Sequence, residues 1–368
     1  RDFQKGNSVS QHALLSPSHA NTWATCPGAP AMEFGRQDES SEAADEGTAA
    51  HFLAYRCMTT GADAKDFLGR VIWVGTSEST GFDGAVFAFE AAGEEADGTF
   101  KRRRGFTIDP VFAGDVQRAV DNTRAFLEGC DFTAFEVRLP LEGVTGEKGA
   151  FGTADVVGIK GSTLLILDWK FGRKEVLPDC LQLKIYSPAA IDKYDTAYGP
   201  FENVRLAIEQ PRTNASLKVA EFSVADLEEF RKEIFGRAWS ALQAFEYRDN
   251  WLGREFSYLT PSPEACQWCK ASGECPGQDK AVQEIIGASF DAIERGDPVP
   301  PAARDSTSPE DMALKLGACD LVESWAKAVK ARAYARVMDG EKLPGFKLVS
   351  GRKGSRAWES ASMAEEAL

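Results

Sequence analysis

The sequence predicts an α/β fold (α+β) in which a central mixed sheet is flanked by helices. Four segments alternate between apolar and polar residues with a period of two, as strands do: 135–141, 151–160, 163–170 and 203–210. Segments with helical character surround them, and one of these, 179–194, separates the last two strands. Of the 368 residues, 43% are hydrophobic and 27% are charged, which is the composition of a globular protein.

The other expected elements follow in chain order. A Ser-Pro-Ser start signal predicts a short helix at 16–26, and strong helix formers predict another at 43–58. Residues 60–110 contain only short strand-like runs, whereas 111–129 has helical spacing and ends at a glycine. A long helix is expected after the last strand, at 224–246. A Pro- and Ser-rich linker and a final helix follow, at 295–308 and about 309–339.

A tight hairpin is expected between the two middle strands. Only Gly161 and Ser162 separate them, and a two-residue loop with glycine first suits a type II′ turn. Because this turn sets the register, Asp155 should lie directly opposite Asp168 on the neighbouring strand. Directly opposed side chains have Cβ atoms about 5 Å apart, and like charges at that distance are destabilising. The two carboxylates therefore need a compensating partner.

Three partners are possible for the two acids, and the hairpin alone does not choose among them. The acids could share a proton, with the pKa of one raised. Lys170, expected on the same face with Trp169 on the other, could form a structural ion pair. A hard divalent cation such as Mg²⁺, which prefers oxygen ligands, could bind both acids.

Two helical features favour the cation. His51 is one of three histidines and follows "EGTAA" on an expected helix, although a lone histidine is more often structural than a ligand. The motif "QLKIY" places Gln182 and Tyr186 four positions apart, on one face of the helix after the hairpin. That spacing also fits an ordinary helix surface.

A second metal centre is indicated by cysteines. Cys266, Cys269 and Cys275 have the spacing C-x2-C-x5-C, which in an intracellular chain indicates a metal site because disulfides are rare there. Cys26 is the best fourth ligand, since Cys26 and Cys275 are both followed by Pro-Gly. Zinc and an iron–sulfur cluster both stay possible. Either would join the N-terminus to a distant segment and make the intervening chain one domain.

The charge of the chain limits how it could bind nucleic acid. The formal net charge is −14, so any contact with DNA must come from a confined patch, whereas a broad basic surface would be usual. The run "KRRR" at 101–104, with Arg102 and Arg103, is one such patch or a solvated charged loop. No apolar run approaches the roughly 18–20 residues of a membrane span, so we expect a cytoplasmic protein without a membrane partner.

The motifs resemble a known nuclease family. In the order "EGTAAH", "GTAD", "DWK" and "QLKIY", the chain is similar to the RecB-type branch of the PD-(D/E)XK nucleases. The split cysteine set resembles the iron–sulfur subgroup, which includes the AddB helicase–nuclease subunit and the CRISPR-associated exonucleases. "HALLSPSHANTWATCPGAPAMEF" and the tail "LPGFKLVSGRKGSRAW" resemble a phage-encoded family within that branch. The resemblance covers about residues 12–280 and implies a restriction-endonuclease-like core.

The resemblance also implies roles for the matching positions. The ligands of Mg²⁺ or Mn²⁺ would be His51, Asp155, Asp168 and the Trp169 carbonyl. Lys170 would position or help deprotonate the attacking water and stabilise charge at the phosphate. Gln182 and Tyr186 would support the site and contact the DNA strand. Separately from the resemblance, Arg102 and Arg103 of the basic run are expected to bind DNA. Asp168 stands where many relatives have Glu.

The same comparison extends to the cysteines and to two further acids. The resemblance implies a structural [4Fe–4S] cluster closing a nuclease domain at 1–294, with Zn²⁺ as the alternative, held by Cys26, Cys266, Cys269 and Cys275. Glu46 matches a family position of unclear role, and Glu136, on the strand before the hairpin, is a further candidate ligand. Residues 309–368 would form a helical extension.

We therefore expect a metal-dependent DNA exonuclease that acts in phage DNA recombination, repair or processing, in the cytoplasm of a bacterial host. The chain lacks a GxxxxGK[ST] loop, so it encodes no helicase motor. The alternatives are a non-catalytic DNA-end-binding or scaffold subunit of the same fold, and a zinc-bound DNA-binding module. Expected partners are DNA ends and a recombination or single-strand-binding protein, with a homo-oligomer possible.

Overall fold

The computed structural model describes residues 13–36, 41–77, 83–90, 100–213, 216–252, 257–286, 309–347 and 349. Side chains of residues 76–103 lie outside this description. The expected linker at 295–308 and nearly all of the tail after 347 also lie outside it. No helix in the described ranges combines the length and the apolar character needed to cross a membrane.

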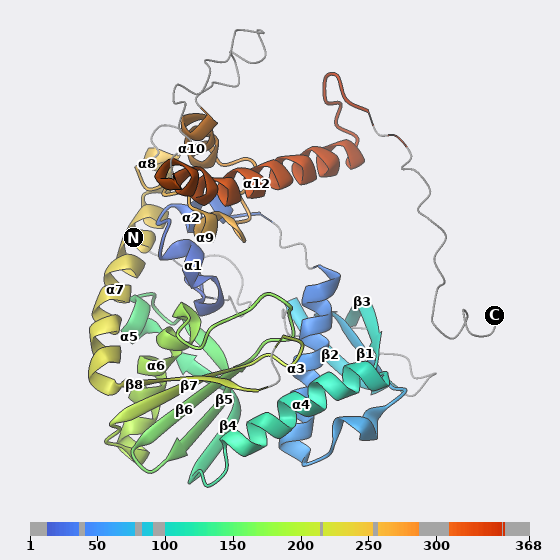
Figure 1. Ribbon diagram of the computed structural model, residues 1–368, viewed down its shortest axis with the longest axis vertical. Coiled ribbons are helices and arrows are strands. Elements are labelled where there is room, and N and C mark those ends of the chain that lie inside the picture. Colours follow the sequence, from blue (N-terminus) through green and yellow to red (C-terminus); the bar gives the residue numbers. More distant parts are fainter. Residues whose placement is uncertain are drawn as a thin grey trace, which may run out of the picture.

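A five-stranded mixed sheet forms the centre of the molecule (Figure 1). The strand order is β4-β5-β6-β7-β8, with the bounds Phe132–Pro140, Phe151–Lys160, Thr163–Trp169, Asn203–Glu209 and Lys218–Ser223. Neighbouring strands are antiparallel except β6 and β7, which are parallel. Helix α6 (Leu181–Tyr198) makes the crossover that a parallel pair requires. The α/β class and the mixed sheet flanked by helices are confirmed, and β8 is an additional strand.

The hairpin between β5 and β6 has the expected turn and register. Gly161 has a φ of +56°, whereas Ser162 is not among the residues with positive φ, as a type II′ turn requires. The pairing runs from Lys160 opposite Thr163 to Val156 opposite Leu167. One step further, at the end of this ladder, come Asp155 and Asp168.

Helices cover both faces of the sheet. One core cluster joins the sheet to α6 and α7 (Val224–Glu246), and the other joins it to α3 (Glu42–Thr60) and α4 (Pro110–Phe126). Local signals explain the helix bounds: Ser41 caps α3 and Gly61 ends it in the left-handed conformation, while Ser223 and Asp226 form a capping box on α7.

A second, three-stranded sheet precedes α4 in the region from which we expected only short strand-like runs. Its order is β2-β1-β3, with the bounds Asp83–Glu90, Val71–Ser77 and Phe100–Thr107. The "KRRR" run at 101–104 lies on β3, so the expectation of a charged loop there is wrong. Antiparallel pairing with β1 gives the backbone of this run its hydrogen-bond partners.

The N-terminal segment lies between the sheet and the cysteine-rich segment (Figure 1). Leu15 and Trp23 join the core cluster of the sheet and α6, whereas Cys26 and Ala29 pack on Ala265. The segment expected as one helix at 16–26 is a 3-10 turn (Pro17–His19) followed by α1 (Ala20–Trp23) and then α2 (Ala29–Glu33). Short helices α9 (Pro263–Cys266) and α10 (Pro276–Ile286) contact the long α12 (Pro309–Met338). The remaining short elements are Ala64–Phe67, α5 (Glu142–Thr145) and α8 (Arg248–Trp251).

Candidate metal and catalytic site

Three acids lie in a row across β4, β5 and β6. Phe135 pairs with Val156 and Val137 with Ala154, so Glu136 lies opposite Asp155. On the other side of Asp155, the β5–β6 register leads to Asp168. Because side chains at paired positions lie on the same face of a sheet, the three carboxyl groups converge. The expectation that Asp155 and Asp168 meet at the end of the hairpin is consistent with this register.

His51 on α3 completes one group of potential metal ligands. Its Nδ1 atom lies 3.5 Å from Asp155 Oδ2, and its ring makes edge contacts with Trp169 and Phe171. Ligand atoms of His51, Glu136 and Asp155 all lie within 4.8 Å of one another. Helix α3 thus brings the histidine to the acids, and Glu136 joins this group more closely than Asp168 does.

Asp168 is held by two side chains that follow it in sequence. Gln182 Nε2 donates a hydrogen bond to Oδ1 at 2.8 Å, and Lys170 Nζ lies 2.7 Å from Oδ2. Lys170 Nζ also donates to Gln182 Oε1 at 3.1 Å, closing a ring of three residues. The buried Oδ2 atom has the Lys170 ammonium as its one partner among the described residues, so it keeps a lone pair for a further ligand.

Burial and mutual repulsion shift the pKa values of these acids upward. Burial, with Asp168 nearby, raises the pKa of Asp155 to about 6 against the opposing effect of His51. The carboxyl of Glu136 loses hydration beside Asp155 and Asp168, which raises its pKa to about 7, although the residue as a whole is exposed. Without a cation, the site therefore favours the neutral, protonated forms of Asp155 and Glu136 more than water does.

Lys170 remains the positive charge of the site. Burial by itself lowers the pKa of its amine, but the charges of Asp168 and Asp155 outweigh this effect and the net shift is upward. Lys170 is thus held as an ammonium group beside Asp168. This charge state suits a group that stabilises anions more than one that accepts a proton.

Trp169 and Tyr186 both belong to the protein interior. The Trp169 ring packs in the core cluster on the α3–α4 side, opposite to the acids as expected, and its backbone N–H donates to Asp155 Oδ2 at 2.7 Å. Tyr186 is 4% exposed and packs so closely on β5 that a Cβ at Gly152 would lie 2.7 Å from its ring. Of the expected DNA-contacting pair on α6, only Gln182 is partly open to solvent.

Glu46 has a structural partner that the sequence did not indicate. Arg212, in the β7–β8 loop, donates to both carboxylate oxygens of Glu46 at 2.9 Å and to Asp115 on α4 at 2.9 Å. It also donates to the carbonyl of Phe171, just after β6. Arg212 thereby ties the start of α3 to the end of β6. No local motif marks an arginine in a loop for this role.

The two expected DNA-contacting arginines lie away from the acids in sequence and sheet. Arg102 and Arg103 are on β3 of the three-stranded sheet, and their side chains lie outside the described residues. Their proposed contact with DNA stays a prediction.

The four expected cluster ligands share one small, largely apolar cavity. Cys26, Cys266, Cys269 and Cys275 all line it, and the backbone N–H of Thr260 points to Cys26 Sγ at 3.3 Å. Burial raises the pKa of each thiol, to about 11 for Cys266. In the described part of the chain, no three of these sulfurs lie within 4.8 Å of one another, so they do not close around a single point.

The sequence as a whole matches one family model. Residues 12–368 match the family described as a protein of unknown function (DUF2800), a range that includes the acids, His51, Lys170 and all four cavity cysteines. This match covers nearly the whole chain and assigns no activity to it. The chain therefore belongs to the DUF2800 family.

Proposed function

We propose that this protein is a divalent-metal-dependent deoxyribonuclease that hydrolyses phosphodiester bonds as an exonuclease. The observation that carries the proposal is the row of Glu136, Asp155 and Asp168, with a histidine at one end and an ammonium group at the other. Structural ion pairs rarely gather three acids against a single lysine, because burial of unbalanced charge is costly.

The donor set fits Mg²⁺ or Mn²⁺. Three carboxylates supply the oxygen ligands that these ions prefer, and Asp168 Oδ2 is a buried oxygen whose one partner among the described residues is the Lys170 ammonium. His51, Glu136, Asp155 and Asp168 would hold the ion, with the Trp169 carbonyl as a further candidate. When bound, it would supply Lewis acidity and a lower pKa for a coordinated water.

The chain's own residues supply positioning and charge. Lys170 places a positive charge where a phosphate would meet the acids, and so stabilises the negative charge that develops during phosphodiester hydrolysis. Gln182 orients both Lys170 and Asp168 through its amide. The Trp169 N–H fixes Asp155. With these contacts, the site is arranged before substrate binds.

The proposal includes a restriction-endonuclease-like core and a [4Fe–4S] cluster on the cysteines. A zinc site with Zn–S distances of about 2.3 Å would bring sulfurs to about 3.8 Å from one another. The four sulfurs line one cavity without closing around a single point, so the cluster is proposed from the donor set itself and its binding would rearrange these side chains. We place the activity in phage DNA recombination, repair or processing in the host cytoplasm, on DNA ends.

The test is hydrolysis of end-labelled linear DNA by the full-length protein with Mg²⁺ or Mn²⁺. We expect stepwise release of nucleotides, and at least a 100-fold loss of rate in Asp168→Asn and Lys170→Ala, since each removes a charge on which the chemistry depends. Asp249→Asn and Lys232→Ala, which change exposed residues of other elements, serve as matched controls.

Cleavage that is equally fast in Asp168→Asn, Lys170→Ala and both controls would overturn the site. Binding of DNA ends without metal-dependent cleavage would instead favour the scaffold alternative. Circular single-stranded DNA distinguishes exonuclease from endonuclease activity, because only an endonuclease can cleave a strand without ends.

A further inference from the structure

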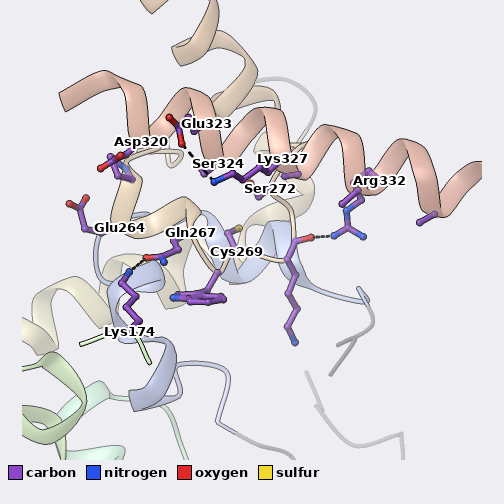
Figure 2. A pocket seen from close by; sticks show the side chains of 16 residues that line it. Lys174, Glu264, Gln267, Cys269, Ser272, Asp320, Glu323, Ser324, Lys327 and Arg332 are labelled. Carbon is purple, nitrogen blue, oxygen red and sulfur yellow. Dashed lines mark hydrogen bonds and ion pairs between the residues drawn. The ribbon is translucent and has the colours of Figure 1, made fainter. Parts of the chain in front are cut away.

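A wide groove lies between the cysteine-rich segment and α12 (Figure 2). Its volume is about 940 Å³, and its walls come from three parts of the chain: α9 with the residues after it, α12, and the loop after β6. Ala328, Ala331 and Ala335 form part of the α12 wall, where their small side chains leave the groove open. The groove is separate from the cavity of the four cysteines, although Cys269 and Ser272 border both.

One side chain in the groove is unusual for a position in contact with water. Trp268, between two of the cysteines in sequence, is 66% exposed. Burial of a tryptophan ring would stabilise the fold substantially, so an indole left in an open groove offers a flat apolar face to a ligand. Such a face can stack on a nucleobase of any sequence.

Charge is distributed unequally along the groove. Asp320, Glu323 and Glu264 gather at one end, whereas Lys327 and Arg332 follow along α12 toward the other (Figure 2). Lys270 also lines the groove, whereas Lys174 lies on the side of Glu264 and Gln267 (Figure 2). Lys327 forms an ion pair with Glu323 at 3.7 Å. In a chain with a net charge of −14, the part of the groove lined by Lys327 and Arg332 is a confined basic patch of the kind that DNA binding by such a chain requires.

Lys174 connects this groove to the acids. It lies four residues after Lys170, and its side chain donates to Gln267 in the groove wall (Figure 2). The intervening loop is held from beneath by Gln210, which is 1% exposed. Gln210 donates to the carbonyls of Gly172 and Lys174 and accepts from the N–H of Val176. A strand lying along this loop would thus pass from the groove toward Lys170.

We propose that the groove binds a single-stranded nucleic acid, with Trp268 stacking on a base and with Lys174, Lys327 and Arg332 near its phosphates. A single strand is favoured over a duplex because only unpaired bases present their faces to an aromatic ring. The acids disfavour phosphates beside them, so the phosphates would lie against Lys327 and Arg332 of α12 and against Lys174 of the loop after β6. This inference rests on the proposed nuclease function and names the form of its substrate.

The test measures binding in EDTA, where hydrolysis is absent. Fluorescence anisotropy of a labelled oligo(dT) of 20 nucleotides with the full-length protein should give a Kd that rises about 5- to 150-fold in Trp268→Ala, the range for loss of one stacked base. Trp239→Ala is the matched control, because Trp239 is also exposed, at 54%, but lies on α7 outside the groove. It should bind as the unaltered protein does.

The lysines are tested by salt dependence. The double variant Lys174→Ala/Lys327→Ala should lower the slope of log K against log salt by about 1.4, since each phosphate contact on a single strand contributes about 0.7. Lys232→Ala should leave the slope unchanged. Oligo(rU) and a DNA duplex are tested in the same way. If Trp268→Ala weakens binding of oligo(rU) as much as binding of oligo(dT), the groove binds both RNA and DNA single strands. If the unaltered protein binds the duplex more tightly than oligo(dT), the proposal is wrong.

The outcomes for groove and nuclease can be told apart. If Trp268→Ala and Trp239→Ala bind oligo(dT) with equal affinity, the groove is not the binding site, even when Asp168→Asn abolishes cleavage. If only Trp268→Ala loses oligo(dT) binding, and the unaltered protein cleaves no DNA with Mg²⁺ or Mn²⁺, the groove is a binding site but the proposed nuclease activity is wrong. Asp168→Asn should retain oligo(dT) binding in EDTA, because it lies outside the groove lining.

Discussion

At the scale of single residues, the site gathers more negative charge than the fold balances, and two of its acids, Asp155 and Asp168, are buried. The acids on three neighbouring strands face one ammonium group, Lys170, and the pKa of Asp155 and of Glu136 is raised. A further acid, Glu209, lies one strand away on β7 beside Trp169. It is 1% exposed, and the Asn122 amide donates to its two carboxylate oxygens at 3.1 and 3.2 Å.

Glu209 should make the stability of the protein depend on pH. Burial raises its pKa to about 7, against the lowering effects of Asn122 and Arg118, whereas in the unfolded chain it is about 4.3. Its contribution to stability is therefore full below about pH 4.3 and is lost as pH rises through about 7. Relative to the unaltered protein, Glu209→Gln should gain free energy of unfolding between pH 5 and pH 8, as measured by urea denaturation.

A matched variant separates this effect from a general loss of negative charge. Glu229→Gln removes an exposed carboxylate of α7 and should leave the pH dependence unchanged. If the curves of Glu209→Gln and the unaltered protein ran parallel from pH 5 to 8, the buried carboxyl would not be the titrating group.

At the scale of elements, the sequence predicted the central sheet well because its signals are local. Alternation marked four of the five strands, and Gly161 with Ser162 set the hairpin register that places Asp155 beside Asp168. The strand β8 escaped notice because it is a short edge strand, half exposed and with charged residues. Arg212 and its ion pairs could not be predicted, since they join segments up to 166 positions apart.

Strand β4 contains one strained residue at the site. Glu136 has a φ of +50°, the left-handed region that residues with a Cβ rarely adopt, and such a conformation costs about 1–3 kcal/mol. Sequence alone gave no sign of it, because alternation continues through this position. The strained backbone lies where the Glu136 carboxylate approaches His51 and Asp155. We infer that the strain is kept because it directs this carboxylate toward the other two potential metal ligands.

Two substitutions of Glu136 separate strain from charge. Glu136→Gly should raise the free energy of unfolding by about 1 kcal/mol more than Glu136→Gln does, because only glycine relieves the backbone. Both variants should bind Mn²⁺ more weakly than the unaltered protein in calorimetric titrations, since both lose a carboxylate. Equal stabilities of the two variants would show that the φ of +50° carries no cost, and unchanged Mn²⁺ affinity would remove Glu136 from the ligand set.

At the scale of the whole molecule, the cysteine cavity is where the N-terminal segment meets the segment after α8. Cys26 Sγ accepts from the N–H of Thr260, which lies 234 positions later, and Gly28 donates to the carbonyl of Tyr258. Arg36 and Glu274 form an ion pair nearby at 2.5 Å. Beside these contacts, Cys26, Ala29 and Ala265 form a small buried cluster, and Ala31 of α2 packs with Ala244 and Trp251 in a second one. A metal centre on the cysteines would add binding energy to this interface.

The last prediction follows from that closure. Cys26→Ser should lower both the iron content and the melting temperature, and should expose the segment around Thr260 to trypsin, because the N-terminal segment would lose its covalent anchor. Cys319→Ser, at an exposed position on α12, is the matched control and should change none of these. Protein purified without oxygen should be brown, with absorbance near 400 nm if the centre is [4Fe–4S]. A colourless protein that holds one zinc ion would show that the centre is a zinc site and not an iron–sulfur cluster. An unchanged melting temperature in Cys26→Ser would show that the N-terminal segment is held in place without any metal.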